Sequence, residues 1–541
     1  MISKVTEHVS SDHIRGLIPY PQSVELGNGS FEFGTGTVLE AVGLEDSAKI
    51  FVDDVAKDSG IRVGDDAARA RSVIRLELAS RSQPGPGRVG PTAGDWMSPD
   101  GASADDEAYS LVIEPGIATV SALGAEGIHR GLTTLRQLVN SYRSGDVAVI
   151  PTTTIRDFPV LGWRGLTVDV ARTFLDVEEV RSIVDTLSLY KMNVLHLHLT
   201  DNDGWRIEID GWPLLTAETE AKRSAGRTSE HYSALDYQAI VRYAAARFVT
   251  VVPEIDIPGH AESILREYPV LGFEGDDGYR WLSPDSDETF GFVGDVLRQV
   301  SDLTTGRFLH LGADEPFGMP SSDYASFMRR ALPIASATGK RLVGWQEASR
   351  ANESGFAAFQ CWIDRDLMSL IEGDPNHRHL TPTMLKHQAE SFSNWGEDAE
   401  RAVELGAKII LSPTSHAYLD VGYGEPDSDG LQETERRRLG YSMYPRVDVE
   451  AYADWALGGS IPASTRTAVV GVEAAIWGET TETLSDVQFL VLPRLPAIAQ
   501  RGWAADPGQW EEYRPRLAAQ EDLWRTRGWN YFRSSVVFAR G

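Results

Sequence analysis

The sequence of 541 residues contains a single cysteine, Cys361. One cysteine cannot form a disulfide within the chain, and it cannot supply the cysteine cluster of a structural zinc site. A disulfide framework and a cysteine-ligated zinc module are therefore excluded.

Positive charge is scarce as well. The chain has 51 Lys and Arg against 79 Asp and Glu, which gives a formal net charge of −28. Nucleic acids and anionic membrane surfaces both reward Lys and Arg. The composition therefore predicts a protein with neither nucleic acid nor membrane as its partner.

Long apolar runs are absent too. No stretch approaches the roughly 18 apolar residues of a membrane-spanning helix, and the first residues, "MISKVTEHVSSDHIRGLIPYPQ", lack the apolar segment of a secretory signal. For the chain as given we expect a cytoplasmic location. The sequence does not indicate an oligomeric state.

The residues that are present fall into two patterns. Residues 1–155 contain short β-like runs, such as "SVIRLELA", "YSLVIEP" and "IATVSAL", and one amphipathic helical stretch, "IHRGLTTLRQLVNSYR". They also contain the Gly- and Pro-rich segment "SQPGPGRVGPTAG", which is typical of an exposed loop. This pattern predicts a small N-terminal α+β domain.

From residue 156 to 505, apolar strand-like runs alternate with helical stretches. Eight such runs with helices between them predict a (β/α)₈ barrel. The runs are 165–170, 193–199, 248–255, 307–312, 341–345, 357–362, 408–413 and 468–477. The acidic segment 414–466 is expected to form a long loop at the mouth of the barrel. Residues 506–541, rich in Trp, are expected to form a helical extension packed on the barrel.

Chemistry in such barrels lies at the carboxyl ends of the strands, so the residues that follow each run are the candidates for a site. They are acids, one histidine and several tryptophans: Asp201, Glu254, Asp256, His260, Asp314, Glu315, Trp345, Glu347, Trp362 and the segments "SHAYLD" and "AIWGE". Tryptophan faces stack on sugar rings, while carboxylates bind sugar hydroxyls. The rim therefore favours a carbohydrate substrate.

Two adjacent acids, Asp314 and Glu315, end the fourth run in "FLHLGADEPF". Consecutive side chains of a regular strand point to opposite faces, so both acids can face one site only if the strand becomes irregular. Gly312 and Pro316 provide that irregularity.

Seven motifs, in order, resemble glycoside hydrolase family 20, the β-N-acetylhexosaminidases. They are "WRGLTVDVAR", "YKMNVLHLHLTDNDGWRIEI", "VPEIDIPGH", "HLGADE", "GWQE", "YLD" and "WGE". "GLIPYPQSVEL" and the stretch around "IHRGLTTLRQLV" are similar to the small N-terminal domain of the family. The resemblance implies an exo-acting retaining enzyme that acts on an oligosaccharide or glycoconjugate with a terminal N-acetylhexosamine. We expect no cofactor and no metal, because no residue cluster in the sequence has convincing metal-ligand spacing.

The resemblance also implies a role for each matching residue. Glu315 would be the general acid/base, Asp314 would orient the 2-acetamido group of the substrate, and His260 with Asp201 would form a relay that tunes Glu315. The substrate-binding residues would be Arg164, Trp345, Trp362, Tyr418, Asp420, Trp477 and Glu479. Three positions depart from the family pattern: Ala313 replaces a second glycine, Thr173 replaces a common histidine, and "DNDGW" replaces D-D-Q-G-W.

In the mechanism that the resemblance implies, the acetamido oxygen of the substrate is the nucleophile and an oxazolinium ion is the intermediate.

Alternatives to this function remain open at this point. A metal-dependent barrel hydrolase could use His196, His198, His260 and Asp314 as ligands, although paired strand histidines are more often hydrogen-bonded core residues. A non-catalytic sugar-binding protein would not need Glu315. A serine hydrolase is disfavoured because no G-x-S-x-G motif occurs. Relatives that release lacto-N-biose or accept 6-phospho-sugars share most of these motifs, and the sequence does not distinguish GlcNAc from GalNAc.

Overall fold

The computed structural model describes residues 14–64, 70–79, 103–217, 230–275, 278–364, 367 and 382–538. These residues form two compact units. The first contains the described residues up to Pro159 together with Ala504–Trp529. The second contains Val160–Trp503 and the described residues from Asn530 onward.

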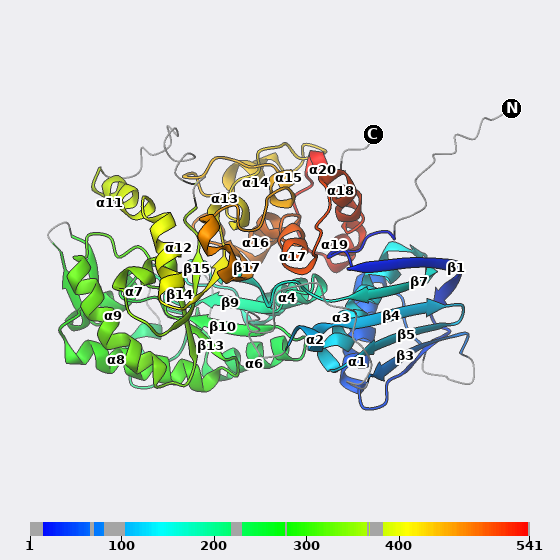
Figure 1. The fold of residues 1–541 in the computed structure, drawn as a ribbon, viewed down its shortest axis with the longest axis horizontal. Helices are drawn as coiled ribbons and strands as arrows, with labels where there is room; N and C mark the ends of the chain where they lie inside the picture. Colours follow the sequence, from blue (N-terminus) through cyan, green and yellow to red (C-terminus); the bar gives the residue numbers. More distant parts are fainter. Residues whose placement is uncertain are drawn as a thin grey trace. The chain divides into compact units, whose positions relative to one another are not determined.

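The first unit is built on a seven-stranded sheet with the order β1-β7-β4-β5-β3-β2 and with β6 paired to β7. The strands are β1 (Ser23–Phe33), β2 (Thr37–Glu40), β3 (Ser72–Leu78), β4 (Tyr109–Glu114), β5 (Ile117–Ala122), β6 (Arg143–Ser144) and β7 (Val147–Asp157). The helices are α1 (Glu45–Ser59), α2 (Ala104–Glu107) and α3 (Ala125–Ser141), and α3 packs on β4, β5 and α1 (Figure 1). The predicted α+β fold is confirmed. The segment "SQPGPGRVGPTAG" lies outside the described residues.

Two helices near the end of the chain, α18 (Trp510–Ala518) and α19 (Glu521–Arg527), also belong to the first unit. The Arg527 Nε atom lies 2.7 Å from Asp58 Oδ1 on α1, and Gln520 Nε2 donates to the carbonyl of Gly16 at 2.6 Å. The structure therefore differs from the expected extension of 506–541 on the barrel. Only the part from Asn530, including α20 (Ser535–Phe538), lies in the barrel unit.

The second unit contains a closed barrel of eight parallel strands, which confirms the predicted fold. The strands are β8 (Trp163–Asp169), β9 (Val194–His198), β10 (Thr250–Glu254), β13 (Phe308–His310), β14 (Arg341–Trp345), β15 (Phe356–Cys361), β16 (Lys408–Leu411) and β17 (Val469–Ile476). Each overlaps one of the eight apolar runs of the sequence.

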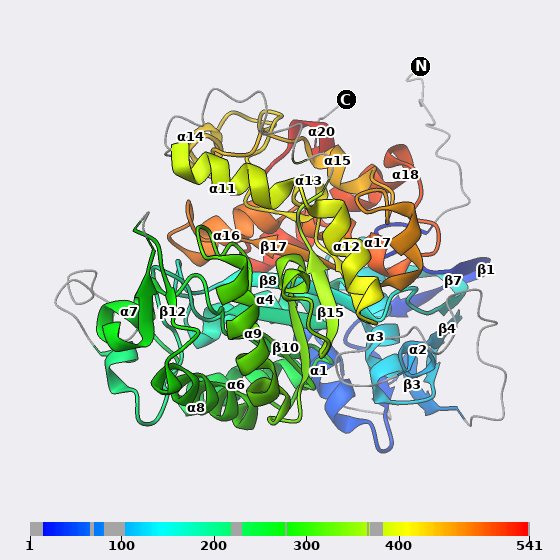
Figure 2. The same ribbon diagram turned by 60° about the vertical axis from the view of Figure 1, so that its left-hand side comes forward.

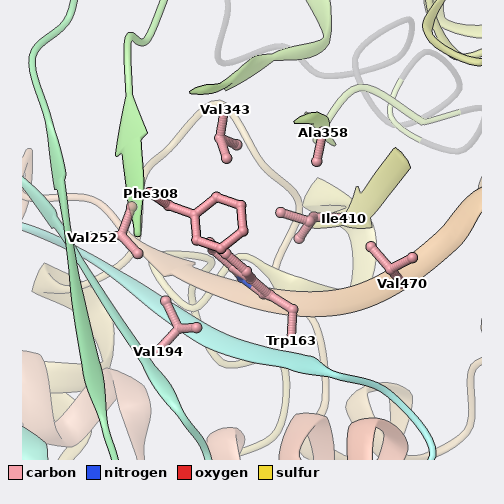
Figure 3. Packing of buried hydrophobic residues seen from close by; sticks show 8 residues of the cluster. All are labelled: Trp163, Val194, Val252, Phe308, Val343, Ala358, Ile410 and Val470. Carbon is pink, nitrogen blue, oxygen red and sulfur yellow. The ribbon is translucent and has the colours of Figure 1, made fainter. Parts of the chain in front are cut away.

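One apolar layer closes the inside of the barrel, and each strand contributes one side chain to it (Figure 3). The layer comprises Trp163, Val194, Val252, Phe308, Val343, Ala358, Ile410 and Val470. The rings of Trp163 and Phe308 meet edge to face with centroids 5.1 Å apart at its centre. Because this layer is packed, the barrel is a solid core rather than an open pore.

Helices surround the strands, as Figure 2 shows. The longer ones are α4 (Val177–Leu189), α6 (Ala234–Ala245), α8 (Asp287–Leu303), α9 (Ser321–Ser336), α11 (Pro382–Phe392), α12 (Trp395–Glu404), α16 (Leu484–Val491) and α17 (Leu495–Trp503). Capping boxes begin α4 at Asp176 and α6 at Ser233. Within the described residues, no helix has both the length and the apolar character needed to cross a membrane.

The remaining elements are short and lie between the barrel strands and helices. They are η3 (Pro213–Thr216), α7 (Glu262–Glu267), η4 (Pro269–Leu271), β11 (Gly272–Glu274), β12 (Arg280–Leu282), η5 (Gln346–Ala351), α13 (Thr414–Ala417), α14 (Glu433–Arg438), α15 (Val449–Ala453) and η7 (Ala463–Ala468). The segment 414–466, expected to be a long loop, thus carries three short α-helices and the beginning of η7.

Candidate active site

A cavity of about 380 Å³ lies at the carboxyl ends of the barrel strands, and it brings together most of the predicted site residues. Those that line it are Asp201, His260, Asp314, Glu315, Trp362, Tyr418, Asp420, Trp477 and Glu479. Arg164 and Trp345 are not among the lining residues. Because the lining side chains come from most of the strands, the barrel itself positions them.

The turn after β13 explains how two consecutive acids face the same cavity. Gly312, Ala313 and Glu315 all have positive φ angles, of 62°, 71° and 43°. This left-handed backbone ends the alternation of the strand. The turn is held from two sides: Asp256 Oδ1 accepts the Ala313 N–H at 3.0 Å, and the Tyr324 hydroxyl donates to the Ala313 carbonyl at 2.7 Å. Ala313, where the family has glycine, adopts the left-handed conformation that glycine reaches more easily.

His260 lies between the two acids and Asp201. Its Nε2 atom is 3.7 Å from Asp314 Oδ2 and 3.6 Å from Glu315 Oε2, and its Nδ1 atom is 3.1 Å from Asp201 Oδ2. The arrangement Asp201–His260–Glu315 is thus the geometry of the predicted relay, with Asp314 reaching the same histidine nitrogen.

The electrostatics of this group follow from burial and from opposite charges. Burial opposes a charged His260, but the Asp201 and Asp256 carboxylates outweigh it and raise the pKa of His260 well above its ordinary value. Burial also raises the pKa of Asp314 to about 6, with His260 opposing the shift and Glu315 adding to it. A cationic imidazole therefore faces two acids.

A buried chain of acids and histidines continues beneath the relay. His198 bridges Asp201 (Nε2 to Oδ2, 3.1 Å) and Glu254 (Nδ1 to Oε2, 2.6 Å), while His310 Nδ1 lies 3.1 Å from Glu254 Oε1. His196 Nδ1 lies 2.8 Å from Glu473 Oε1. Burial works against ionisation of Glu254, but His198, His310 and His196 hold its pKa well below its ordinary value. The strand histidines therefore have the hydrogen-bonded arrangement of core residues.

Four triads among the described residues place His or carboxylate ligand atoms within 4.8 Å of one another and could hold a metal ion. They are His196–Glu254–His310, His198–Glu254–Asp256, Asp201–Asp256–His260 and His260–Asp314–Glu315. Many of the same atoms serve the chain of ion pairs and hydrogen bonds described above, so a metal ion would compete with that chain for its ligands.

Aromatic side chains form one wall of the cavity. Trp362, Tyr418 and Trp477 line it; Trp362 and Tyr418 belong to one buried cluster with Trp345, and the partly buried Trp477 packs against that cluster. The rings of Trp362 and Tyr418 are nearly parallel, at 10° and 6.1 Å between centroids. Trp345 packs against Trp477 at 5.7 Å, and its indole N–H donates to Glu254 at 2.8 Å. Trp345 therefore supports the wall from behind.

Asp420, Glu479 and Arg172 form an ionisable group on the cavity. Neither carboxyl oxygen of Asp420 accepts a hydrogen bond from the described residues. Burial raises its pKa well above the ordinary value, and Glu479 adds to the shift. Arg172 lies near Glu479, with Nε 3.8 Å from Oε1, and its NH2 and NH1 atoms are 2.9 Å from Asp201 and 2.7 Å from Asp169. A buried acid without a partner is suited to accept hydrogen bonds from a polar ligand.

The predicted substrate-binding role of Arg164 does not fit its position. Arg164 is fully buried at the amino end of β8. It donates to the carbonyls of Leu161 and Lys191, at 2.6 and 3.0 Å, and lies over the Trp503 ring at 5.0 Å. Since ligands bind at the opposite, carboxyl ends of the strands, Arg164 has a structural position, whereas Arg172 lines the cavity.

The sequence prediction missed several lining residues. Arg172 stands just past the carboxyl end of β8, so the strand-end rule would have found it. Tyr279 and Trp281 come from the β11–β12 region, and Tyr441, Met443 and Tyr444 from the segment 414–466. Of these others, Trp281 lies in the three-residue strand β12 and the rest lie outside regular elements, so no periodic pattern marks them.

A (β/α)₈ barrel with paired acids, an aromatic wall and further carboxyl groups at its carboxyl rim has the features of a glycoside hydrolase. The family model "Glycosyl hydrolase family 20, catalytic domain" matches residues 161–325 and 319–506, and "Glycosyl hydrolase family 20, domain 2" matches residues 15–158. The chain belongs to glycoside hydrolase family 20.

Individual relatives agree with this assignment. A β-N-acetylhexosaminidase from Cellulomonas fimi is 33% identical over 444 residues, which cover 80% of this chain and 82% of that protein. The solved N-acetyl-β-hexosaminidase of Streptomyces plicatus superposes with a TM-score of 0.76 at 32% identity, over 97% of both chains. A family 20 β-N-acetylhexosaminidase from Streptomyces coelicolor A3(2) has the same TM-score at 31% identity, covering 97% of this chain and 98% of that one.

Proposed function

We propose that this glycoside hydrolase is an exo-acting, retaining β-N-acetylhexosaminidase. It releases terminal non-reducing β-GlcNAc or β-GalNAc from an oligosaccharide or glycoconjugate. The substrate supplies its own nucleophile, and an oxazolinium ion is the intermediate. Relatives support the sugar: a Streptomyces plicatus β-hexosaminidase mutant has been solved in complex with the product GlcNAc.

The placement of Asp314 and Glu315 carries this proposal. A conventional retaining glycosidase needs an acid and a nucleophile on opposite sides of the scissile bond. Here both carboxyls come from one turn and approach the same nitrogen of His260, at 3.7 and 3.6 Å. They lie on one side of the cavity. The two carboxyls are therefore better placed to serve as a general acid and as a group that orients the acetamido group than as an acid and a nucleophile.

In the first step, the acetamido oxygen of the substrate attacks the anomeric carbon. The bond from that carbon to the leaving oxygen breaks, and Glu315 gives its proton to the leaving oxygen. The Asp314 carboxylate accepts the N–H of the acetamido group and steadies the positive charge that develops there. Proton transfer of this kind typically contributes about a hundredfold to ten-thousandfold in rate.

In the second step, water attacks the anomeric carbon and gives a proton to Glu315. The bond between the anomeric carbon and the acetamido oxygen, which closed the oxazolinium ring, breaks. Two inversions at one carbon give net retention. Arg172, Asp420 and Glu479 bind the ring hydroxyls, and Tyr418 donates to the acetamido carbonyl. Trp362 and Trp477 enclose its methyl group, because an apolar wall fits a methyl and excludes water.

The experiment compares substrates with and without the acetamido group. An aryl β-glucoside, with a 2-hydroxyl, should be hydrolysed orders of magnitude more slowly than the matching β-N-acetylglucosaminide. The cyclic thiazoline that mimics the oxazolinium ion should bind much more tightly than GlcNAc, since intermediate mimics exploit complementarity that the product lacks.

Asp314→Asn provides the matched variant. The amide cannot hold the positive nitrogen as an anion does, so thiazoline inhibition should weaken strongly while GlcNAc inhibition changes less. Equal hydrolysis of glucoside and N-acetylglucosaminide by the wild type, or equal binding of thiazoline and GlcNAc, would refute the substrate-assisted mechanism.

A further inference from the structure

Two residues directly after β14, Gln346 and Glu347, both form hydrogen bonds with Trp362 of the cavity wall. Gln346 binds its backbone and Glu347 binds its side chain. Gln346 Oε1 accepts the backbone N–H groups of Trp362 and Ile363, both at 2.9 Å. The carboxyl of Glu347 accepts the indole N–H of Trp362, at 3.2 Å to Oε1 and 3.1 Å to Oε2. One residue therefore fixes the backbone of Trp362 and the next fixes its ring.

The backbone of Trp362 is held on its other side as well. Its carbonyl accepts the backbone N–H and the hydroxyl of Thr414, both at 3.0 Å. With the backbone tied to two neighbouring strand ends, the remaining freedom of Trp362 is rotation of its side chain. The bond from the indole N–H to Glu347 is the polar contact that selects one rotation.

Glu347 is fully buried. Among the described residues, no Lys, Arg or His side chain forms a hydrogen bond with its carboxyl. The nearby guanidinium of Arg350 is bound to Asp398 and Ser391, for example from Nε to Asp398 Oδ1 at 3.0 Å. Burial raises the pKa of Glu347 to about 8, with Arg350 opposing the shift and Asp314 adding to it. A buried polar group is costly unless it is hydrogen-bonded, and the indole N–H of Trp362 is a donor that the Glu347 carboxyl has here.

We propose that Glu347 is a positioning residue that fixes the ring of Trp362 and thereby sets the size of the 2-acyl group that the cavity accepts. This inference rests on the proposed function, in which Trp362 encloses the acetamido methyl. Glu347 itself is not one of the residues lining the cavity and acts through the tryptophan.

Substitutions at 347 separate the hydrogen-bond acceptor from the bulk of the side chain. Glu347→Gln keeps an oxygen acceptor and the shape, whereas Glu347→Leu keeps an apolar volume and loses the acceptor. The measurement is the ratio of kcat/KM for an aryl N-acetylglucosaminide to kcat/KM for its N-butanoyl analogue. This ratio does not depend on the fraction of folded enzyme, so a merely structural role would leave it unchanged.

The expected result is a ratio within about twofold of wild type for Glu347→Gln. For Glu347→Leu the ratio should fall on the order of tenfold, as loss of one buried hydrogen bond permits, because a loosened Trp362 lets the larger acyl group enter. In a Trp362→Phe background, which has no indole N–H, Glu347→Leu should change the ratio no further.

Three results would overturn the inference: an unchanged ratio in Glu347→Leu, an equal fall in Glu347→Gln, or a further fall in the Trp362→Phe background. If Glu347→Leu does not fold, Glu347→Met, with an unbranched side chain of similar length, serves for the same ratio. A wild-type enzyme without activity on any N-acyl glucosaminide would instead refute the proposed function, so the two failures are distinguishable.

Discussion

Asp314 must be ionised for its proposed role, yet its surroundings make ionisation difficult. Burial and the neighbouring Glu315 favour the protonated form, and His260 favours the anion. The balance places the pKa of Asp314 at about 6, above its ordinary value. The state of one carboxyl therefore connects the packing of the cavity to the pH range of the enzyme.

The first prediction concerns that pH range. A carboxyl with a raised pKa is protonated below it, so kcat/KM should fall as the pH is lowered through about 6. The measurement is a pH profile of kcat/KM, which reports the free enzyme. In Asp314→Asn the residual activity should lack this acidic limb. An identical limb in the variant would assign it to another group.

The second prediction separates the two arginines. Lysine keeps the charge but loses the planar fork of donors. Arg172→Lys should raise KM about tenfold, as loss of a charge-assisted hydrogen bond to substrate permits. Arg164→Lys should lower Tm and leave KM unchanged, because its partners are the carbonyls of Leu161 and Lys191. Kinetics and thermal unfolding of both variants check this. The reverse pattern would restore Arg164 to the substrate site.

These residues also show how far sequence predicts a site. The strand-end rule places chemistry at the carboxyl rim, and nine of the eleven predicted residues do line the cavity. The resemblance assigns Arg164 to substrate binding. The strand-end rule does not, because Arg164 lies early in its strand. Trp345 does end a strand, but it packs behind Trp477, and only three-dimensional packing decides which of two neighbouring rings reaches the surface.

At the scale of elements, alternation of apolar runs and helices predicted all eight barrel strands. Each run is mostly apolar rather than strictly alternating, which is the pattern of a parallel sheet that is buried on both faces. The same pattern could not predict that the last part of the chain is divided between the two units. Helices α18 and α19 are amphipathic, and an amphipathic face shows that a partner exists without showing which one. The ion pair of Arg527 with Asp58 ties them to the first unit.

The third prediction tests the turn after β13. A Cβ atom added at Gly312 would lie 1.9 Å from Asp256 Oδ1, the atom that accepts the Ala313 N–H. Gly312→Ala should therefore displace the turn that carries Asp314 and Glu315. We expect kcat to fall by a factor on the order of a hundred, the loss typical of a misplaced catalytic group.

Gly339 provides the matched control for this prediction. It has a similarly positive φ of 78°, but an added Cβ would meet nothing within 4 Å. Gly339→Ala should cost about 1–2 kcal/mol of stability from left-handed strain and leave kcat unchanged. If both variants lost activity equally, backbone strain rather than the contact with Asp256 would be responsible.

At the scale of the whole molecule, the fourth prediction is that activity survives prolonged chelation and dialysis. The acids and histidines at the strand ends already form hydrogen bonds and ion pairs with one another, such as His198 with Glu254 at 2.6 Å. The proposed mechanism routes no step through a metal ion. Activity assays before and after treatment with a chelator check this. Loss of activity that a divalent ion restores would return the metal-dependent hydrolase to consideration.

The composition of the whole chain supports expectations that only experiment can test. Its net charge of −28 disfavours nucleic acids and anionic membranes as partners. These partner assignments and the cytoplasmic location stay predictions.

The unpartnered carboxyl of Asp420 has a further consequence, for the heat of binding. Burial raises the pKa of Asp420 well above the ordinary value, so in the unliganded enzyme this carboxyl stays protonated over a wider pH range. Sugar hydroxyls that donate to Asp420 favour its anion, so binding should expel protons into the solvent and affinity should rise with pH. Calorimetric titration of GlcNAc in buffers with different ionisation enthalpies should then give different heats. Asp420→Asn should reduce that difference, whereas equal heats for the wild type in all buffers would show that binding moves no proton.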